Sequence, residues 1–267
     1  MQRVLVAVLL GSLAFFAVGV SQEIFLPQGA SAVGLAWSPD GTELVVSYRM
    51  GREGAAECFA MPSGEGRWRT GGLGLLTPLC APAFSHVGDV VAIGGQEGVW
   101  LLSAADGAIL QRVEFEERFH PLAIAFRPDD GLAVVVEEVR GFPGSMYLEL
   151  WDQAGNLRER RLLGKRHTPA RQAKAAFSQD GRWLAFAAGT EEDPDGETWG
   201  VYLLDLEAGT LHSWDLRELL PDLPWEELRV ATAGVAVRPD GKEIAVGLYS
   251  SGSDTPLVLR LDTEFDR

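Results

Sequence analysis

Short apolar runs recur along this chain, and the same kind of polar turn joins them in pairs. In the first pair, Ala36-Trp37 leads into Ser38-Pro39-Asp40-Gly41, and a second apolar run, Leu44-Val45-Val46, begins three residues after the glycine. Apolar runs of this length that are bounded by Pro, Asp and Gly are typical of β-strands joined by a tight turn. The pattern therefore predicts a β-hairpin.

The hairpin recurs with variations, so the chain is organised as a repeat. Five copies contain, in order, Ala36, Ala83, Ala125, Ala176 and Ala236. Their spacing is close to or above the roughly 40–45 residues of a four-stranded propeller blade. In every copy the alanine precedes a larger residue, so small and large side chains lie on opposite faces of one strand. Sheets of this kind can stack with the bulky face of one on the small face of the next.

The turn chemistry predicts backbone geometry. Proline presets the first corner, aspartate bonds back to its own backbone, and glycine takes the left-handed conformation that a side chain would make costly. We therefore expect a positive φ at Gly41, Gly181 and Gly241. At Gly131 the expectation stays open, because the extra residue Asp130 precedes it.

Further strands complete each repeat. A third strand is predicted at Glu57–Met61, Val99–Ser103, Tyr147–Asp152, Val201–Leu206 and Leu257–Asp262. In the first four repeats a turn with glycine and a more polar fourth strand follow, but the chain stops at Arg267 before the fifth repeat has one. We expect Glu23–Leu26 to supply that strand beside Leu257–Asp262 and to close the ring. The predicted fold is an all-β, five-bladed β-propeller of four-stranded antiparallel blades, closed by an N-terminal strand.

The repeat resembles the bacterial WD40-like repeat family, a TolB-type family with a Pro-Asp turn. The resemblance covers Ala32 to Asp262, although the full Ser-Pro-Asp-Gly sequence is present only at Ser38–Gly41 and two copies read Arg-Pro-Asp. It implies a β-propeller fold. It does not specify a function, because propellers host unrelated activities.

Residues 1–20 differ from the rest of the chain. Arg3 precedes an apolar stretch from Val4 to Val20, and small residues near Gly19 could serve as a cleavage site. Seventeen apolar residues are long for a signal peptide and short for a membrane-spanning helix. We expect a cleaved signal peptide or an uncleaved N-terminal anchor. Both place a single propeller domain, residues 21–267, outside the cytoplasm, either periplasmic or secreted.

Composition excludes some classes of partner. The chain has 267 residues, 46% of them hydrophobic, which suits one domain with a sizeable core, and its net charge is −15. An acidic protein is a poor match for nucleic acid or for an anionic membrane surface. We expect no nucleic-acid partner, and membrane contact only through an uncleaved N-terminal segment.

Cys58 and Cys80 are the only cysteines. In an exported protein they could form a disulfide, and they could equally be two separate buried thiols. The sequence leaves both possibilities open. Without a pair of histidines nearby they do not form a metal site.

Evidence for catalysis is thin. The four histidines are isolated in sequence, and no nucleophile, zinc or phosphate-binding motif is present. We therefore assign no catalytic residue, no metal ligand and no cofactor. The leading hypothesis is an exported, non-catalytic propeller that acts as a binding scaffold for a protein or peptide. The alternative is a propeller hydrolase or lyase with a carboxylate or metal site at the mouth of the central channel.

The longest connections are all expected on the face opposite the Pro-Asp turns: Gly164–Gln172, Thr190–Thr198, Arg217–Thr232 and, shorter, Ser250–Thr255. Loops on a rigid scaffold often carry binding residues. A basic cluster and two aromatic residues lie in or beside these loops, so the predicted partner-binding residues are Arg166, His167, Arg171, Trp199 and Trp225.

Structural explanations for the same residues stay open. The basic loop could pair with the acidic segment Glu191–Glu197, and each tryptophan could anchor its own loop. The acidic segment also resembles the first half of a calcium-binding loop, but Tyr202 stands where such a loop has its bidentate glutamate. A short helix is predicted over 222–228, where aspartate, proline and two glutamates suit a first turn.

Overall fold

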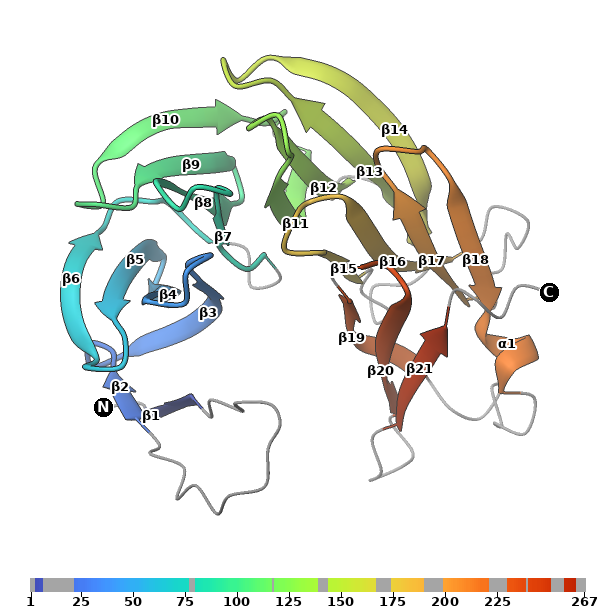
Figure 1. Cartoon of the computed structure of the whole chain (residues 1–267), viewed down its shortest axis with the longest axis horizontal. Coiled ribbons are helices and arrows are strands. Elements are labelled where there is room, and N and C mark those ends of the chain that lie inside the picture. The colour runs from blue at the N-terminus through green and yellow to red at the C-terminus, as the bar shows by residue number, and fades with distance from the viewer. Residues whose placement is uncertain are drawn as a thin grey trace.

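The computed structural model describes residues 3–6, 22–76, 80–116, 118–138, 144–166, 174–189, 199–220, 230–238, 240–250 and 257–262. Within these residues the chain forms antiparallel strands and one short helix, α1 (Leu216–Leu219). After a two-stranded sheet of β1 (Arg3–Val6) and β2 (Gln22–Phe25), the strands follow one another along an arc as five antiparallel groups (Figure 1). The third and fourth groups are joined in one eight-stranded sheet. We call these groups blades 1 to 5 in chain order.

The first three blades have four strands each in simple up-and-down order. Blade 1 contains β3 (Ala30–Trp37), β4 (Glu43–Met50), β5 (Glu53–Ala60) and β6 (Glu65–Thr70). Blade 2 contains β7 (Ala83–Phe84), β8 (Val90–Gly95), β9 (Gly98–Ser103) and β10 (Ile109–Glu114). Blade 3 contains β11 (Phe119–Phe126), β12 (Leu132–Glu138), β13 (Gly144–Trp151) and β14 (Leu157–Arg166).

The last two blades differ in their edges. Blade 4 contains β15 (Lys174–Phe177), β16 (Trp183–Gly189), β17 (Trp199–Asp205) and β18 (Leu211–Asp215). Its β16 also pairs with β14 of blade 3 at Lys165 and Gly189, which links the two sheets. Blade 5 has three strands in the described residues: β19 (Val230–Val237), β20 (Glu243–Ser250) and β21 (Leu257–Asp262).

The antiparallel propeller blades predicted from the hairpin repeat are confirmed. Each predicted third strand overlaps the observed one, three of them extend one residue past its end, and the last, Leu257–Asp262, has the predicted bounds. In blades 2 to 5 the first strand pairs with the second so that two alanines face each other: Ala83 with Ala92, Ala125 with Ala133, Ala176 with Ala185, and Ala236 with Ala245. In blade 1 Ala36 faces Val45.

The hydrophobic core is divided among the interfaces between consecutive blades. The larger residue after each alanine packs toward the preceding blade: Phe84 joins the cluster shared by blades 1 and 2, Phe126 that of blades 2 and 3, and Phe177 that of blades 3 and 4. Val45, Ala92, Ala133 and Ala185 are 0% exposed because the bulky face of the next blade covers them. This is the small-on-large stacking that the alternation predicts.

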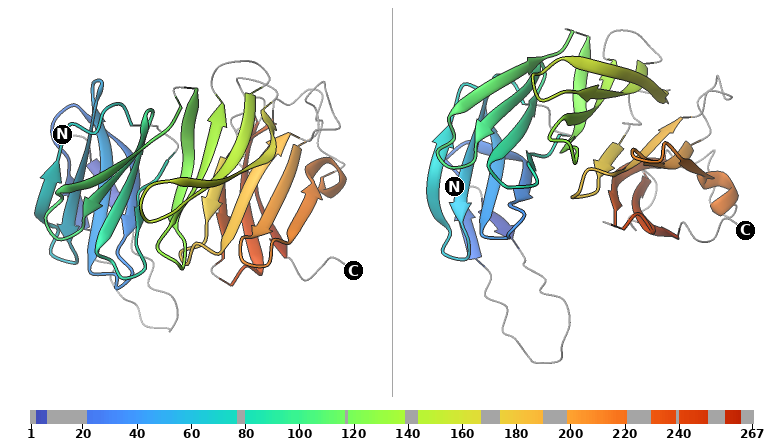
Figure 2. Two further views of the ribbon diagram at one scale, coloured as in Figure 1. Left: turned by 90° about the horizontal axis from the view of Figure 1, so that it is seen from above. Right: turned by 45° about the horizontal axis from the view of Figure 1, so that its top comes forward.

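Ring closure is not observed. The predicted closing strand corresponds to β2 (Gln22–Phe25), but β2 pairs with β1 (Arg3–Val6) and not with β21. Figures 1 and 2 show blades 1 and 5 at opposite ends of the arc. The physical reason is that an apolar segment close in sequence is available to β2, and pairing it requires less loop-closure entropy than joining the two ends of the chain.

The turns behave as predicted where the motif is regular. Gly41, Gly181 and Gly241 have φ of 72°, 66° and 70°. In the longer third copy the left-handed position moves back by one residue to Asp130, at φ 59°. Aspartate tolerates this conformation better than most residues.

The two cysteines are free and lie in different core clusters, Cys58 between blades 1 and 2 and Cys80 between blades 2 and 3. Burial raises the pKa of the Cys58 thiol to about 12, so it packs as a small apolar side chain. The possibility of two buried thiols is the one the structure supports. Among the helical residues that are described, no segment has the length and hydropathy of a membrane span.

Candidate functional site

The turns between the first and second strands of the blades define one face of the propeller, which we call the turn face. The opposite face, with the longer connections, is the loop face. The loop-face prediction is only partly placed: Arg166 ends β14 and Trp199 begins β17, and the backbones of these strands flank Gly189 of β16. His167, Arg171 and Trp225 lie outside the described residues, as do 191–197 and the helix expected at 222–228, and α1 ends before that segment.

On the turn face, the aspartate of four of the five turns is held by the side chain two residues before it. In blades 1 and 4 the hydroxyl of Ser38 or Ser178 donates to Asp40 or Asp180 two residues on. In blades 3 and 5 arginine replaces serine, and ion pairs Arg127–Asp129 (2.9 Å) and Arg238–Asp240 (3.3 Å) take over. The aspartate is thus explained by the turn in all four copies.

The turn of blade 2 departs from this pattern. Its sequence is Ser85-His86-Val87-Gly88, and the amide of Gly88 donates to the carbonyl of Ser85 at 3.0 Å as in the regular turns. The Ser85 hydroxyl donates instead to Asp89, at 2.7 Å. Because Asp89 takes over the structural hydrogen bond, the turn does not require the residues at positions 86 and 87. Val87 is 78% exposed.

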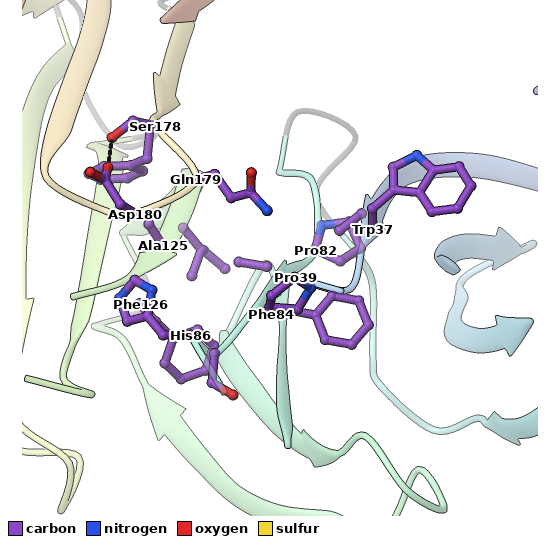
Figure 3. Close-up of a pocket in the computed structure, with 15 residues that line it drawn as sticks. Trp37, Pro39, Pro82, Phe84, His86, Ala125, Phe126, Ser178, Gln179 and Asp180 are labelled. Carbon is purple, nitrogen blue, oxygen red and sulfur yellow. Dashed lines mark hydrogen bonds between the residues drawn. The ribbon is translucent and has the colours of Figure 1, made fainter. Parts of the chain in front are cut away.

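A hollow of about 540 Å³ lies on the turn face, along the inner edge of the arc, and we call it the channel mouth. The ends of the first strands of blades 1 to 4 line it, together with turn residues of blades 1, 2 and 4. Figure 3 shows Phe84, Phe126 and Ala125 around it, with Gln179 extending from the blade 4 turn into the space and Trp37 farther from that turn. A concave, mainly apolar site with a few convergent polar groups is the usual form of a binding site.

One polar atom in this lining has no partner. The Nε2 atom of His86 is buried and forms no hydrogen bond. A buried polar atom without a hydrogen bond costs about 1–3 kcal/mol, which a bound partner could offset. The irregular turn therefore contributes to the hollow a histidine whose buried Nε2 has no hydrogen-bond partner.

A buried carboxylate in blade 3 has a structural role, because its hydrogen-bond partners lie within the same blade. Glu149, which is 0% exposed, accepts hydrogen bonds from Arg160 (2.8 Å) and from the Trp151 indole (3.1 Å). Burial raises the pKa of Glu149, and Arg160 opposes that shift. The residues involved belong to the third and fourth strands of blade 3, away from the channel-lining first strands. Within the described part of the chain, no three His, Cys, Asp or Glu side chains are grouped to hold a metal ion.

The residues of the channel mouth are not among those predicted from the sequence to bind a partner. His86 was visible as a lone histidine in a hairpin turn, and it gave no functional signal by itself. A usable signal was present in the comparison among repeats, because blade 2 alone lacks both proline and aspartate in its turn. That departure marks positions 86 and 87 as residues that the fold does not require.

Comparison with solved structures confirms the TolB-type, WD40-like propeller fold. TolB from Acinetobacter baumannii superposes with a TM-score of 0.54 at 13% identity over 90% of this chain. The chain spans 57% of the length of that protein. A putative TolB from Agrobacterium tumefaciens gives a TM-score of 0.57 at 14% identity, covering 91% of this chain and 81% of that one.

A chain of the Mitotic Checkpoint Complex gives a TM-score of 0.59 at 13% identity, covering 92% of this chain and 72% of that one. At such identities the likeness concerns the fold alone. No family model matches the chain, and no curated protein matches it in sequence.

Proposed function

We propose that this propeller is an exported, non-catalytic scaffold that binds a protein or peptide partner, and that the channel mouth on the turn face is the docking site. The observation that carries the proposal is His86, which lines the 540 Å³ hollow and has a buried, unpaired Nε2. Aromatic residues beside it supply the kind of anchor that dominates binding energy at interfaces. A propeller of similar fold occurs in a chain of a multiprotein complex, which supports the scaffold role without specifying a partner.

The test uses the chain from residue 21 onward, immobilised and exposed to cell-envelope extract. His86→Pro restores the proline of the regular turn, so it removes the imidazole while preserving the backbone hydrogen bond from Gly88 to Ser85. We expect the captured partner to be lost with His86→Pro at an unchanged melting temperature. A photocrosslinking residue at position 179 should label the partner.

Retention of the partner by His86→Pro, together with no crosslink from position 179, would contradict docking at the channel mouth. The hydrolase or lyase alternative is tested in parallel. Turnover of ester, glycoside or peptide substrates by the purified chain that is lost on replacing one carboxylate would favour that alternative.

The loop face stays proposed as a second contact surface. Arg166, His167, Arg171, Trp199 and Trp225 combine the basic cluster of the sequence with two aromatic residues of the predicted loop face. If they contribute, the Arg166→Ala, Trp225→Ala double variant should weaken partner binding without lowering the melting temperature. Full binding by this variant would contradict a role for the loop face, and the turn face would then be the remaining proposed binding surface.

We also propose that the five blades close into a ring. Ala236 and Ala245 are exposed on blade 5, whereas Val45, Ala92 and Ala185, which occupy the position of Ala245 in other blades, are fully buried by a following blade. Val258 beside them is 69% exposed. Such a flank fits the bulky face of blade 1, and removal of an N-terminal signal would release β2 from β1 to pair with β21.

A further inference from the structure

A second hollow lies on the turn face between blades 2 and 3. Its volume is about 310 Å³, at the low end of the range for small binding sites. Apart from the buried Ser85, the buried and half-buried apolar lining residues come from both blades: Val90, Leu101, Val113, Phe126 and Leu132. We call this hollow the inter-blade groove. It shares Ser85 and Phe126 with the channel mouth but extends outward along the edge of blade 2.

Two irregular positions in blade 2 place apolar side chains at the rim of the groove. Val87 occupies the turn position that holds aspartate in the regular copies, and it is 78% exposed. Leu110 lies where the register between β9 and β10 shifts, between Ile109 and Gln111, and it is 57% exposed. Bulges of this kind re-aim a side chain. β10 is the outermost strand of blade 2 (Figure 1).

The polar part of the rim is acidic. Asp89, Asp130 and Asp152 line the groove, and no lysine or arginine is among its lining residues. Arg158 pairs with Asp152 at 2.6 Å, so the net negative charge comes from the other two. Asp130 is exposed at the left-handed corner of its turn, and within the described residues its carboxylate forms no ion pair. An apolar groove with acidic edges complements an apolar side chain with basic neighbours.

We propose that the inter-blade groove binds an extended protein segment in which aliphatic residues are flanked by lysine or arginine. The aliphatic side chains pack on Val87, Leu110 and the groove floor, and the basic ones face Asp89 and Asp130. The inference rests on the scaffold function proposed above, but it concerns a different site and a defined class of partner.

The test is a titration of the chain from residue 21 onward with three fluorescein-labelled hexapeptides. The first is Gly-Lys-Leu-Val-Lys-Gly, the second replaces both lysines with glutamate, and the third replaces Leu-Val with Gly-Gly. Anisotropy should show binding of the first peptide, weakening with salt because exposed charges contribute. We expect the other two peptides to bind at least about tenfold more weakly.

Two neutral substitutions separate the apolar and charged contributions. Val87→Asn keeps a residue that suits a turn and removes the apolar contact, so affinity should fall about fivefold. Asp130→Asn keeps a residue that tolerates φ 59° and removes one charge, so affinity should fall about threefold and the salt dependence should weaken. Matched controls are Leu211→Asn, at an apolar position 49% exposed in blade 4, and Glu53→Gln, at an exposed carboxylate in blade 1. Both should leave affinity unchanged.

Several results would overturn the groove assignment. These are no binding of the basic peptide, equal binding of the acidic one, or unchanged affinity in both Val87→Asn and Asp130→Asn. Failure of the channel-mouth function is distinguishable, because His86→Pro should affect partner capture and leave the peptide titration unchanged. If His86→Pro loses the captured partner but the basic peptide does not bind the unmodified chain, the groove proposal is refuted and the channel-mouth proposal is kept.

Discussion

At the scale of single residues, the turns show how one structural task can be met by different side chains. The regular copies hold their aspartate with a serine hydroxyl or with an arginine, whereas in blade 2 the carboxylate that Ser85 contacts has moved to Asp89. Because Asp89 accepts the hydrogen bond from the Ser85 hydroxyl, the turn does not need proline at position 86 or aspartate at position 87. Both candidate sites on the turn face depend on this substitution.

Valine at two of the turn glycines should have unequal effects. Gly41 has a positive φ but open space around its Cβ position, so Gly41→Val should destabilise by about 1–2 kcal/mol through backbone strain alone. At Gly181 an added Cβ would also clash with the backbone carbonyl of Phe126 in blade 3, so Gly181→Val should cost more. Urea unfolding of the two variants measures the difference. Equal losses would show that the turn of blade 4 does not contact blade 3.

The buried ion pair of blade 3 gives a pH-dependent prediction. Arg160→Met leaves Glu149 buried without its cation and should destabilise the protein by about 2–4 kcal/mol near neutral pH. Burial already raises the pKa of Glu149, and loss of Arg160 raises it further. A carboxyl group with a raised folded-state pKa stabilises the fold only below its unfolded pKa. The variant should therefore lose stability, relative to wild type, as pH rises from about 4 to 7. Denaturant midpoints of the variant and wild type across that pH range measure this loss. A stability difference that does not change with pH would contradict the prediction.

At the scale of elements, stability resides in the contacts between neighbouring blades. Each sheet presents small residues on one face and bulky residues on the other, and the cross-strand pair Ala176–Ala185 shows the small face of blade 4. Side-chain bonds also cross between blades, as where the Trp68 indole donates to the carbonyl of Ala104 at 2.6 Å. Each blade is therefore stabilised mainly by packing against the neighbouring blades, and less by the hydrogen bonds between its own strands.

Enlarging a small residue inside such an interface should be destabilising. Ala185 is 0% exposed and packs in the cluster with Ile244 and Val246 of blade 5. Ala185→Leu would force two blades apart and should cost about 1–3 kcal/mol. Thermal unfolding measures this loss, and a neutral result would mean that blades 4 and 5 are not tightly packed against each other.

At the scale of the whole molecule, contact between the first and last blades would turn the arc into a closed ring. Ile24 and Leu26 are 2% and 3% exposed against blade 1, so deletion of residues 21–28 should lower the melting temperature by several degrees even without closure. That deletion alone does not distinguish an open arc from a ring.

Ala245→Leu provides the sharper test. In the open arc Ala245 is exposed, and a larger side chain there should change stability by less than about 0.5 kcal/mol. In a closed ring it would face the bulky flank of blade 1 and should cost about as much as Ala185→Leu. Comparing the two variants in one denaturation series decides between the arrangements, and a neutral Ala245→Leu would contradict our proposal of closure.

The sequence by itself determined the repeat, the strand order within each blade and the stacking polarity. These follow from local rules: glycine fixes the turns at Gly41 and Gly181, with proline added in the first of them, and the alternation of small and large residues fixes which face is bulky. Only the tertiary structure showed that β2 pairs with β1, that Cys58 and Cys80 lie in separate clusters, and that His86 and Val87 border two hollows. Such features depend on which distant segments meet, and residue order alone does not specify that.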